Sequence, residues 1–234
     1  MTRLAIIGLG RMGRAVEELA PWHGFDVVAR IAPSGGSARE VTAATLNGAD
    51  VAVEFTVAAA VPGHVRACAQ AGCPVVVGTT GWDARRAEVE SLIADGPGAL
   101  LAAPNFSLGM AAFMMVVETA AAAMRSAPGF DAHIIETHHA QKQDAPSGTA
   151  LALARAAAAG LGRDVPITSV RTGSVPGTHE VVFDGQFEQV RLEHVARDRR
   201  VFAEGALRAA QWLVGRRGVF TLRDVLTTNK EPGR

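Results

Sequence analysis

A glycine-rich turn near the N-terminus constrains the fold of this chain more than any other feature. The segment GLGRMG at 8–13 has the spacing G-x-G-x-x-G, follows an apolar run and precedes a helical pattern. In a strand–helix–strand unit, Gly8 permits the tight turn, Gly10 leaves room for a pyrophosphate, and Gly13 lets the helix approach the strand. The N-terminus of such a helix also offers N–H groups to phosphates. We therefore expect a dinucleotide site at Gly8, Leu9, Gly10, Arg11, Met12 and Gly13. The alternative is a tight glycine turn that binds no ligand.

The first hundred residues alternate short β-branched runs with helical patterns. Strands are expected at 4–7, 27–31, 50–55, 74–77 and 99–102, and helices at 14–22, 62–71 and 84–94. Such alternation with short connections is typical of a parallel sheet covered by helices on both faces. The sequence thus predicts the α/β class, with a Rossmann-like, doubly wound parallel sheet.

The pattern changes after residue 107, where a smaller α+β domain with a largely antiparallel or mixed sheet is predicted. Its expected elements are helices at 108–125 and 149–159 and strands at 132–137, 168–172, 180–183 and 187–196. Asp184-Gly185-Gln186 is a short hairpin signal. A helix at 202–214 and an apolar tail at 222–226 follow, and we expect the tail to return to the first domain.

The charge balance narrows the range of partners. Lys and Arg total 23, and so do Asp and Glu, so no global positive field favours nucleic acid or an anionic membrane. The apolar stretch at 108–124 contains Glu118 and is expected to be a buried helix rather than a membrane span. Cys68 and Cys73 are expected to be small buried side chains in a reducing compartment. Because the first ten residues lack the apolar core of a signal peptide, we expect a cytoplasmic protein.

Two later turns follow expected strands and belong to the same edge of the predicted sheet. They are Gly78-Thr79-Thr80-Gly81 and Ala103-Pro104-Asn105-Phe106. Ligands of open α/β sheets bind beyond the carboxyl ends of the strands. Both turns are therefore candidate cofactor contacts. Alternatively they are ordinary connections in which Thr80 or Ser107 caps a helix.

The densest group of reactive side chains begins at the end of the strand expected at 132–137. His138, His139 and Lys142 lie within five residues of one another. If the strand continued, His138 and His139 would point to opposite faces, so we expect them not to share a metal ion. His138 and Lys142 can instead converge through the turn as proton donors.

The next segment, DAPSGTA at 144–150, is typical of a helix start. Ser147 is a plausible N-cap, and the N–H groups of Gly148 and Thr149 form an anion cradle suited to a carboxylate. A capped surface helix with solvated His and Lys is the alternative. Taken together, the motifs predict a reductase in which a dinucleotide supplies hydride, a cationic pocket holds an anionic substrate, and His138 or Lys142 supplies a proton.

One signal of dinucleotide sites is missing. An acid at the end of the second strand usually holds the adenosine ribose, but Ala32 and Pro33 occupy that place. No fixed negative charge therefore opposes a 2′-phosphate, which Arg11, Ser34 or Arg39 can reach. We expect NADPH to serve at least as well as NADH, although the sequence leaves the preference open.

These motifs resemble those of the 4-hydroxy-tetrahydrodipicolinate reductases (dihydrodipicolinate reductases) of lysine biosynthesis. The resemblance rests on GLGRMG, GTTG, APNFSLGM, HHAQKQDAPSGTA, RTGSVPGTHEVVF and GVFTLRDVL, which occur in the family's order over nearly the whole chain. It implies reduction of dehydrated 4-hydroxy-tetrahydrodipicolinate to tetrahydrodipicolinate by NADH or NADPH, in the diaminopimelate route to lysine. It further implies a substrate domain with an open mixed sheet, through which the chains assemble as a homotetramer.

The resemblance also implies roles for individual residues and domains. His138 is the expected proton donor and acceptor, and Lys142 the proton donor. A dicarboxylate substrate is expected to be bound by His139, Ser147, Gly148 and Thr149. The cofactor is expected to contact the glycine turn together with Gly78, Thr79, Thr80, Ala103, Pro104, Asn105 and Phe106. Residues 1–106 with 207–234 form the expected dinucleotide-binding domain, and 107–206 the substrate-binding and oligomerisation domain.

Two other functions stay open at this point. One is a reductase of the same architecture that acts on a different amino-acid precursor, and the other is a dinucleotide sensor without activity. The intact pair of His138 and Lys142 argues against a sensor. Thioester-forming aldehyde dehydrogenases are disfavoured because neither cysteine lies in a loop suited to a nucleophile.

Overall fold

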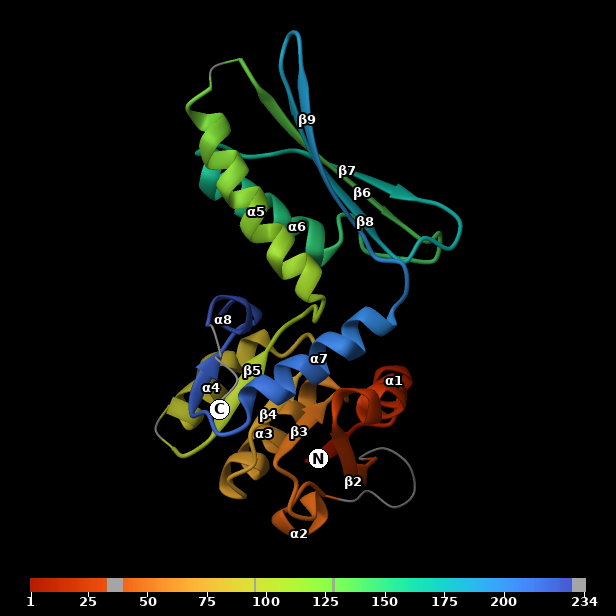
Figure 1. Cartoon of the computed structure of the whole chain (residues 1–234), viewed down its shortest axis with the longest axis vertical. Helices are drawn as coiled ribbons and strands as arrows, with labels where there is room; N and C mark the ends of the chain where they lie inside the picture. Colours follow the sequence, from red (N-terminus) through yellow and green to blue (C-terminus); the bar gives the residue numbers. More distant parts are fainter. Residues whose placement is uncertain (33–39, 95, 128, 229–234) are drawn as a thin grey trace. The chain divides into compact units, whose positions relative to one another are not determined.

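The computed structural model describes residues 1–32, 40–94, 96–127 and 129–228. The chain divides into two compact units, one formed by Met1–Ser107 with Arg200–Arg234 and the other by Leu108–Arg199 (Figure 1). Each unit has a sheet and a hydrophobic core of its own.

A parallel sheet of six strands forms the centre of the first unit, in the order β10-β5-β4-β3-β1-β2. The strands are β1 (Thr2–Ile7), β2 (Phe25–Ile31), β3 (Val51–Glu54), β4 (Val75–Val77), β5 (Ala99–Ala102) and β10 (Gly218–Phe220). The prediction of a Rossmann-like sheet is confirmed. β1 lies between β2 and β3, where the strand order reverses and where open α/β sheets bind their ligands.

Helices cover both faces of this sheet because its strands are apolar on both sides. Every residue of β3, β4 and β5 is buried, as is usual for parallel strands between two helical layers. The helices are α1 (Arg11–Leu19), α2 (Ala43–Leu46), α3 (Val61–Gln70), α4 (Arg86–Ala94), α7 (Arg200–Leu213) and α8 (Leu222–Thr227). α7 packs on α1, β3 and β4, while Val65 of α3 and Ile93 of α4 belong to the core on the side of Ala5 and Ile7.

The sequence does not predict two short elements of the first unit. The three residues of β10 extend the sheet by pairing in parallel with β5. α2 is a single turn whose N-cap, Thr42, accepts a hydrogen bond from the backbone N–H of Thr45. Both segments are too short to show a hydrophobic period.

The second unit has a mixed sheet of four strands, in the order β7-β6-β8-β9. The strands are β6 (Asp131–His138), β7 (Ile167–Arg171), β8 (Thr178–Asp184) and β9 (Gln189–Val195). β6 runs parallel to β7, and the pairs β6–β8 and β8–β9 are antiparallel. The predicted open mixed sheet is therefore confirmed.

Two helices, α5 (Leu108–Arg125) and α6 (Gly148–Leu161), pack against each other in the second unit. They approach closely at Gly160, where a Cβ atom would lie 2.4 Å from the carbonyl oxygen of Glu118. α5 is long and apolar enough to cross a membrane by length and composition alone. Only Met110, Val117 and Ala121 of α5 are buried. The helix is therefore less buried than the sequence analysis expects.

Candidate functional site

The glycine turn of the first unit has the packing that its spacing predicts. Gly8 has φ +97°, and a Cβ atom there would lie 2.1 Å from the carbonyl oxygen of Phe55. A Cβ atom at Gly13 would lie 1.9 Å from the carbonyl oxygen of Gly8, whereas one at Gly10 would meet no atom within 4 Å. The chain's own backbone thus fills the space at Gly8 and Gly13. The space at Gly10, directly before α1, is open.

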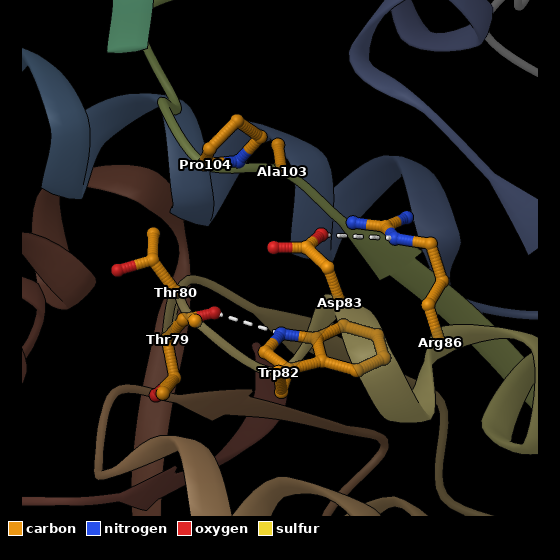
Figure 2. Close-up of a pocket in the computed structure, with 8 residues that line it drawn as sticks. Thr79, Thr80, Trp82, Asp83, Arg86, Ala103 and Pro104 are labelled. Atoms are coloured by element: carbon orange, nitrogen blue, oxygen red, sulfur yellow. Dashed lines mark hydrogen bonds and ion pairs between the residues drawn. The ribbon is translucent and has the colours of Figure 1, made fainter. Parts of the chain in front are cut away.

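The turns that follow β4 and β5 line one pocket (Figure 2). Thr79 holds the first turn in place: its hydroxyl accepts a hydrogen bond from the Thr56 N–H at 2.7 Å, and its carbonyl accepts one from Trp82 Nε1 at 2.9 Å. The residues that line the pocket are Thr79, Thr80, Gly81, Trp82, Asp83, Arg86, Ala103 and Pro104. Two segments that the sequence assigns to the same edge therefore lie together.

The remaining predicted cofactor residues differ in accessibility. Phe106 is 2% exposed, and its ring centroid lies 6.2 Å from that of Phe55 in an edge-to-face contact. The Asn105 side-chain oxygen accepts a hydrogen bond from the Ser107 N–H at 2.8 Å. Phe106 can therefore offer a ligand only its backbone. Arg11 is exposed at the start of α1.

The segment after β2, which the sequence analysis expects near the cofactor's 2′-position, is described only at its first residue. Ala32 is half-buried just beyond β2. Pro33, Ser34 and Arg39 lie outside the described residues.

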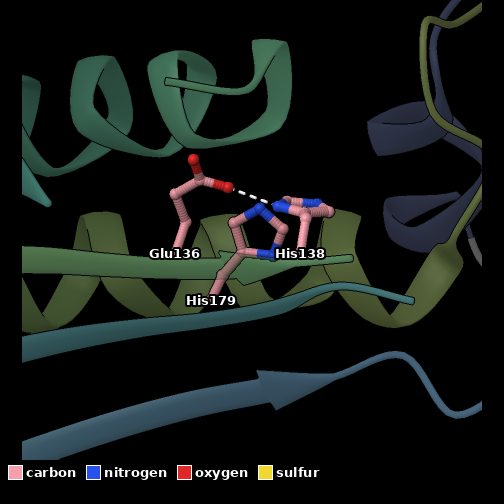
Figure 3. Close-up of side chains that lie close together, drawn as sticks. All are labelled: Glu136, His138 and His179. Atoms are coloured by element: carbon pink, nitrogen blue, oxygen red, sulfur yellow. Dashed lines mark hydrogen bonds and ion pairs between the residues drawn. The ribbon is translucent and has the colours of Figure 1, made fainter. Parts of the chain in front are cut away.

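In the second unit, the register of β6, β7 and β8 assembles a buried polar cluster (Figure 3). Glu136 and His138 are two residues apart on β6, so both side chains point to the same face. Arg171 of β7 is paired with His138, and His179 of β8 is paired with Glu136. Three neighbouring strands thus place Glu136, His138, Arg171 and His179 together.

Glu136 is the centre of this cluster and is fully buried. One of its carboxylate oxygens is hydrogen-bonded to His138 Nδ1, and the other lies 2.6 Å from Arg171 Nη2. Burial by itself would raise the pKa of Glu136, but hydrogen bonds from Arg171 and Ser169 outweigh it and lower the pKa to about 2. An ionised carboxylate only accepts hydrogen bonds. His138 therefore donates its Nδ1 proton to Glu136, which leaves Nε2 as the ring nitrogen that Glu136 does not engage.

The two imidazoles of the cluster lie in edge-to-face contact, with ring centroids 5.2 Å apart. Burial lowers the pKa of His138, and the Glu136 carboxylate opposes this shift. Burial and the neighbouring His138 lower the pKa of His179 to about 4, so His179 is neutral at pH 7. Neither ring nitrogen of His179 has a hydrogen-bond partner among the described residues.

The cluster also has the composition of a metal site, which the sequence argument does not foresee. That argument considers only a metal ion shared by His138 and His139. The structure instead brings ligand atoms of Glu136, His138 and His179 within 4.8 Å of one another. The Arg171 guanidinium already pairs with Glu136, and its positive charge opposes a cation. A cation bound here would therefore lie next to the charge of Arg171.

Lys142 lies in the turn after β6. Burial is the main cause of the lowered pKa of His138, and the charge of Lys142 adds to it. Its Nζ atom lies 2.7 Å from Asp144 Oδ1, a partner that the sequence reasoning missed. His139 is half-buried, and its Nε2 atom accepts a hydrogen bond from Arg199 Nη2 at 3.0 Å. Two cationic groups, Lys142 and Arg199, thus accompany the expected substrate residues.

The start of α6 has the predicted cap. Ser147 is buried, and its hydroxyl accepts a hydrogen bond from the Ala150 N–H at 3.1 Å. Its own N–H donates to Glu136 at 3.4 Å, which links the helix start to the buried cluster. Gly148 is exposed, and a Cβ atom there would meet no atom within 4 Å. Ser147 therefore shapes the helix start, and the first turn at Gly148 is open to solvent.

Sequence comparisons agree with this arrangement. The profile "Dihydrodipicolinate reductase, N-terminus" matches residues 2–106, and "Dihydrodipicolinate reductase, C-terminus" matches 109–226. A 4-hydroxy-tetrahydrodipicolinate reductase of Thiobacillus denitrificans is 40% identical and covers 96% of this chain and 98% of its own length. One from Acidiphilium cryptum is 38% identical and covers 96% and 97%.

A similar fold is found among solved structures. The dipicolinate-bound dihydrodipicolinate reductase from Paenisporosarcina sp. TG-14 has a TM-score of 0.79 and 25% identity, and the match covers 94% of this chain and 97% of that one. An aspartate dehydrogenase from Thermotoga maritima, with a TM-score of 0.51 and 12% identity, shares the fold alone.

Proposed function

The chain belongs to the dihydrodipicolinate reductase family, and from this premise we propose how its residues carry out the reduction. It is an oxidoreductase that uses a nicotinamide cofactor to reduce dehydrated 4-hydroxy-tetrahydrodipicolinate to tetrahydrodipicolinate, in the diaminopimelate route to lysine. The first unit is proposed as the cofactor domain and the second as the substrate domain.

The cofactor is proposed to bind along the carboxyl edge of the first sheet. The open space at Gly10 fits a pyrophosphate at the N-terminus of α1. The pocket beside Thr80 and Ala103 is proposed to hold the nicotinamide end. The reduced nicotinamide supplies a hydride when it is bound. The backbone at Gly8 and Gly13 keeps the turn in shape for this contact.

His138 is proposed to exchange the proton that accompanies hydride transfer. The observation that carries this assignment is the series Arg171–Glu136–His138, in which Glu136 and His138 are buried. Arg171 keeps Glu136 ionised, Glu136 holds the Nδ1 proton of His138, and Nε2 is left to give or take a proton. Lys142, the nearby cation, is proposed as the second proton donor.

The substrate is proposed to be a dicarboxylate bound at the start of α6. The N–H groups of Gly148 and Thr149 lie in the first turn of a helix, where an anion is favoured by the helix dipole. Lys142 and His139 add cationic and hydrogen-bonding groups, and Ser147 fixes the helix start. The dipicolinate bound to the Paenisporosarcina enzyme is a planar dicarboxylate, which supports this assignment.

Turnover of freshly generated 4-hydroxy-tetrahydrodipicolinate with NADH or NADPH tests the function. Replacement of His138 or Lys142 by Ala is expected to lower kcat by about 10²- to 10⁴-fold, because a positioned acid is lost, with little change in cofactor affinity. A double variant with near-native turnover would contradict the assignment. No turnover by the native chain would favour a sensor, and turnover of a different precursor alone would favour another reductase.

We further propose that NADPH serves at least as well as NADH. Position 32, where an acid would disfavour NADPH, is occupied by Ala32. Arg11 is exposed and lies in the glycine turn. The ratio of kcat/KM for the two cofactors tests this at saturating substrate. A preference for NADH above about tenfold, or about 1.4 kcal/mol, contradicts the proposal. Ala32→Asp is expected to move the ratio towards NADH.

The assembly is proposed to be a cytoplasmic homotetramer formed through the second sheet. β7 and β9 are the edge strands of that sheet, and residues of β9 alternate between half-buried and exposed. Edge strands with such a face can pair with or pack on another copy. Sedimentation of the native chain at several concentrations tests the state.

A further inference from the structure

The turn between β6 and α6 already contains a carboxylate of the chain itself. Lys142 Nζ lies 2.7 Å from Asp144 Oδ1. Hydrogen bonding to Lys142 lowers the pKa of the Asp144 carboxyl, and the backbone N–H of Gly148 adds to this shift. These are two of the groups proposed above to hold a carboxylate of the substrate.

We infer that Asp144 occupies the position of a substrate carboxylate in the free enzyme, so that substrate binding exchanges one carboxylate for another. The inference rests on the proposed function, since that function assigns Lys142 and Gly148 to the substrate. It adds a residue that sets the affinity of the same site.

The backbone and the side chain of Asp144 are held very differently. The carbonyl oxygen accepts a hydrogen bond from Arg171 Nη2 at 2.5 Å, and Arg171 is fixed by the buried Glu136. The carboxylate end is 56% exposed. The main chain is therefore anchored to the buried cluster, while rotation of the side chain can release Lys142 and Gly148.

The exchange lowers the affinity of every ligand that places a carboxylate at this position. An exposed ion pair contributes little, so Asp144 lowers ligand affinity by only about two- to fivefold. The opposite arrangement, in which Asp144 orients Lys142 for the ligand, predicts weaker binding when Asp144 is changed.

Asp144→Asn separates these two arrangements, because Asn keeps the size and the acceptor oxygen but loses the charge. Pyridine-2,6-dicarboxylate is titrated into the NADPH-bound enzyme by calorimetry. We expect the Kd to fall by about two- to fivefold, and the KM of the substrate to fall with it. An unchanged or higher Kd overturns the inference.

Asp131→Asn is the matched control. It removes the same charge from the same unit, but Asp131 pairs with Arg163 at 2.9 Å instead of with Lys142. The Kd of this variant should equal that of the native enzyme. An equal fall in both variants would mean that net charge alone acts, which also overturns the inference.

A measurement on the native chain does not depend on how the variants fold. In a crystal structure with pyridine-2,6-dicarboxylate bound at Gly148, the Asp144 carboxylate should lie beyond hydrogen-bonding distance of Lys142 Nζ. Retention of both Asp144 contacts beside the bound ligand contradicts the exchange. Both binding measurements are made without turnover. A chain that binds the dicarboxylate but has no reductase activity would refute the proposed function. The exchange of carboxylates would still be tested by its own outcome.

Discussion

At the scale of single residues, Glu136 determines which nitrogen of His138 is available. Glu136→Gln removes the charge that favours the protonated form of His138, so the pKa of His138 should fall. If protonated His138 is the donor, the loss of activity at rising pH should begin at lower pH. We expect kcat to fall by about tenfold or more, measured as a pH–rate profile.

The control for Glu136→Gln is Glu180→Gln, which removes an acid of β8 paired with Arg191 at 2.9 Å. Its profile should match that of the native enzyme. A uniform loss of activity in Glu136→Gln, with no shift of the profile, would indicate a structural role only. Because Arg171 would lose its buried partner, folding of the variant must be checked, as breaking a buried pair costs about 3–5 kcal/mol.

His179 makes the second unit sensitive to mild acid. Its pKa is about 4 in the folded chain and 6.5 for a free imidazole, so the unfolded chain binds more protons between these values. The contribution of neutral His179 to the free energy of unfolding is therefore fully present above pH 6.5, and it is lost as the pH drops towards 4. Between pH 7 and pH 5 the free energy of unfolding should decrease by about 2 kcal/mol through this residue.

Urea unfolding of the native chain and of His179→Asn at both pH values measures this effect. The difference between pH 7 and pH 5 should be smaller in the variant, whatever its absolute stability. His23→Asn, in the other unit, is the matched control and should retain the native difference. An equal pH dependence in all three proteins would contradict the assignment to His179.

Some residues of the site can be recognised from a local sequence pattern, and others are placed there only by the pairing of distant strands. His138 and Lys142 are recognised because they lie within one short segment, and the cap at Ser147 is recognised from the helix-start pattern and confirmed. Glu136 could be found as the residue two positions before His138 on a strand. Arg171 and His179 could not, because their place depends on the register of three strands that are distant in sequence.

At the scale of elements, the three glycines of the phosphate turn are not equivalent. Gly13→Ala places a Cβ atom 1.9 Å from a carbonyl oxygen, so it should destabilise the first unit by about 1–3 kcal/mol. Gly10→Ala meets no atom and should leave stability near the native value, while it weakens NADPH binding.

Thermal unfolding and titration with NADPH measure the two properties separately. Gly63→Ala, in α3, is a control in which a Cβ atom also meets no atom within 4 Å. It should change neither property beyond the small effect of helix propensity. Native NADPH affinity in Gly10→Ala would contradict the proposed pyrophosphate contact.

The accuracy of the element predictions follows the length of each element. α5 begins and ends at the predicted residues, 108 and 125, because eighteen residues give several turns of apolar repeat. β10 has three residues and becomes a strand only because the edge of β5 is available to it. The burial of α5 was overestimated because apolar composition does not tell which face a helix buries.

At the scale of the whole molecule, the two ligands should protect different parts of the chain. The proposed cofactor residues all belong to the first unit and the proposed substrate residues to the second. NADPH alone should slow hydrogen exchange in 1–107, and pyridine-2,6-dicarboxylate alone in 139–150. Protection of 139–150 by NADPH alone, to the same extent, would contradict separate binding sites.

The architecture as a whole was predictable because each half repeats its pattern many times. Alternating strands and helices predict the parallel sheet, and the change of pattern after residue 107 predicts a second unit with a mixed sheet, which the structure confirms. The order of strands within each sheet is set by long-range pairing, so no local pattern contains it.

The alignment of β6 with β7 and β8 also decides which length changes this enzyme can tolerate during evolution. Length changes in the hairpin turn at 185–188 leave Arg171 and His179 opposite their partners. The connection at 172–177 is less tolerant, because the Thr172 N–H donates a hydrogen bond to the His138 carbonyl and Gly177 packs against the His138 ring. A single residue inserted between Glu136 and His138 would turn one of the two side chains to the opposite face. Homologues of different lengths are therefore expected to gain and lose residues in the hairpin turn but not within this short stretch.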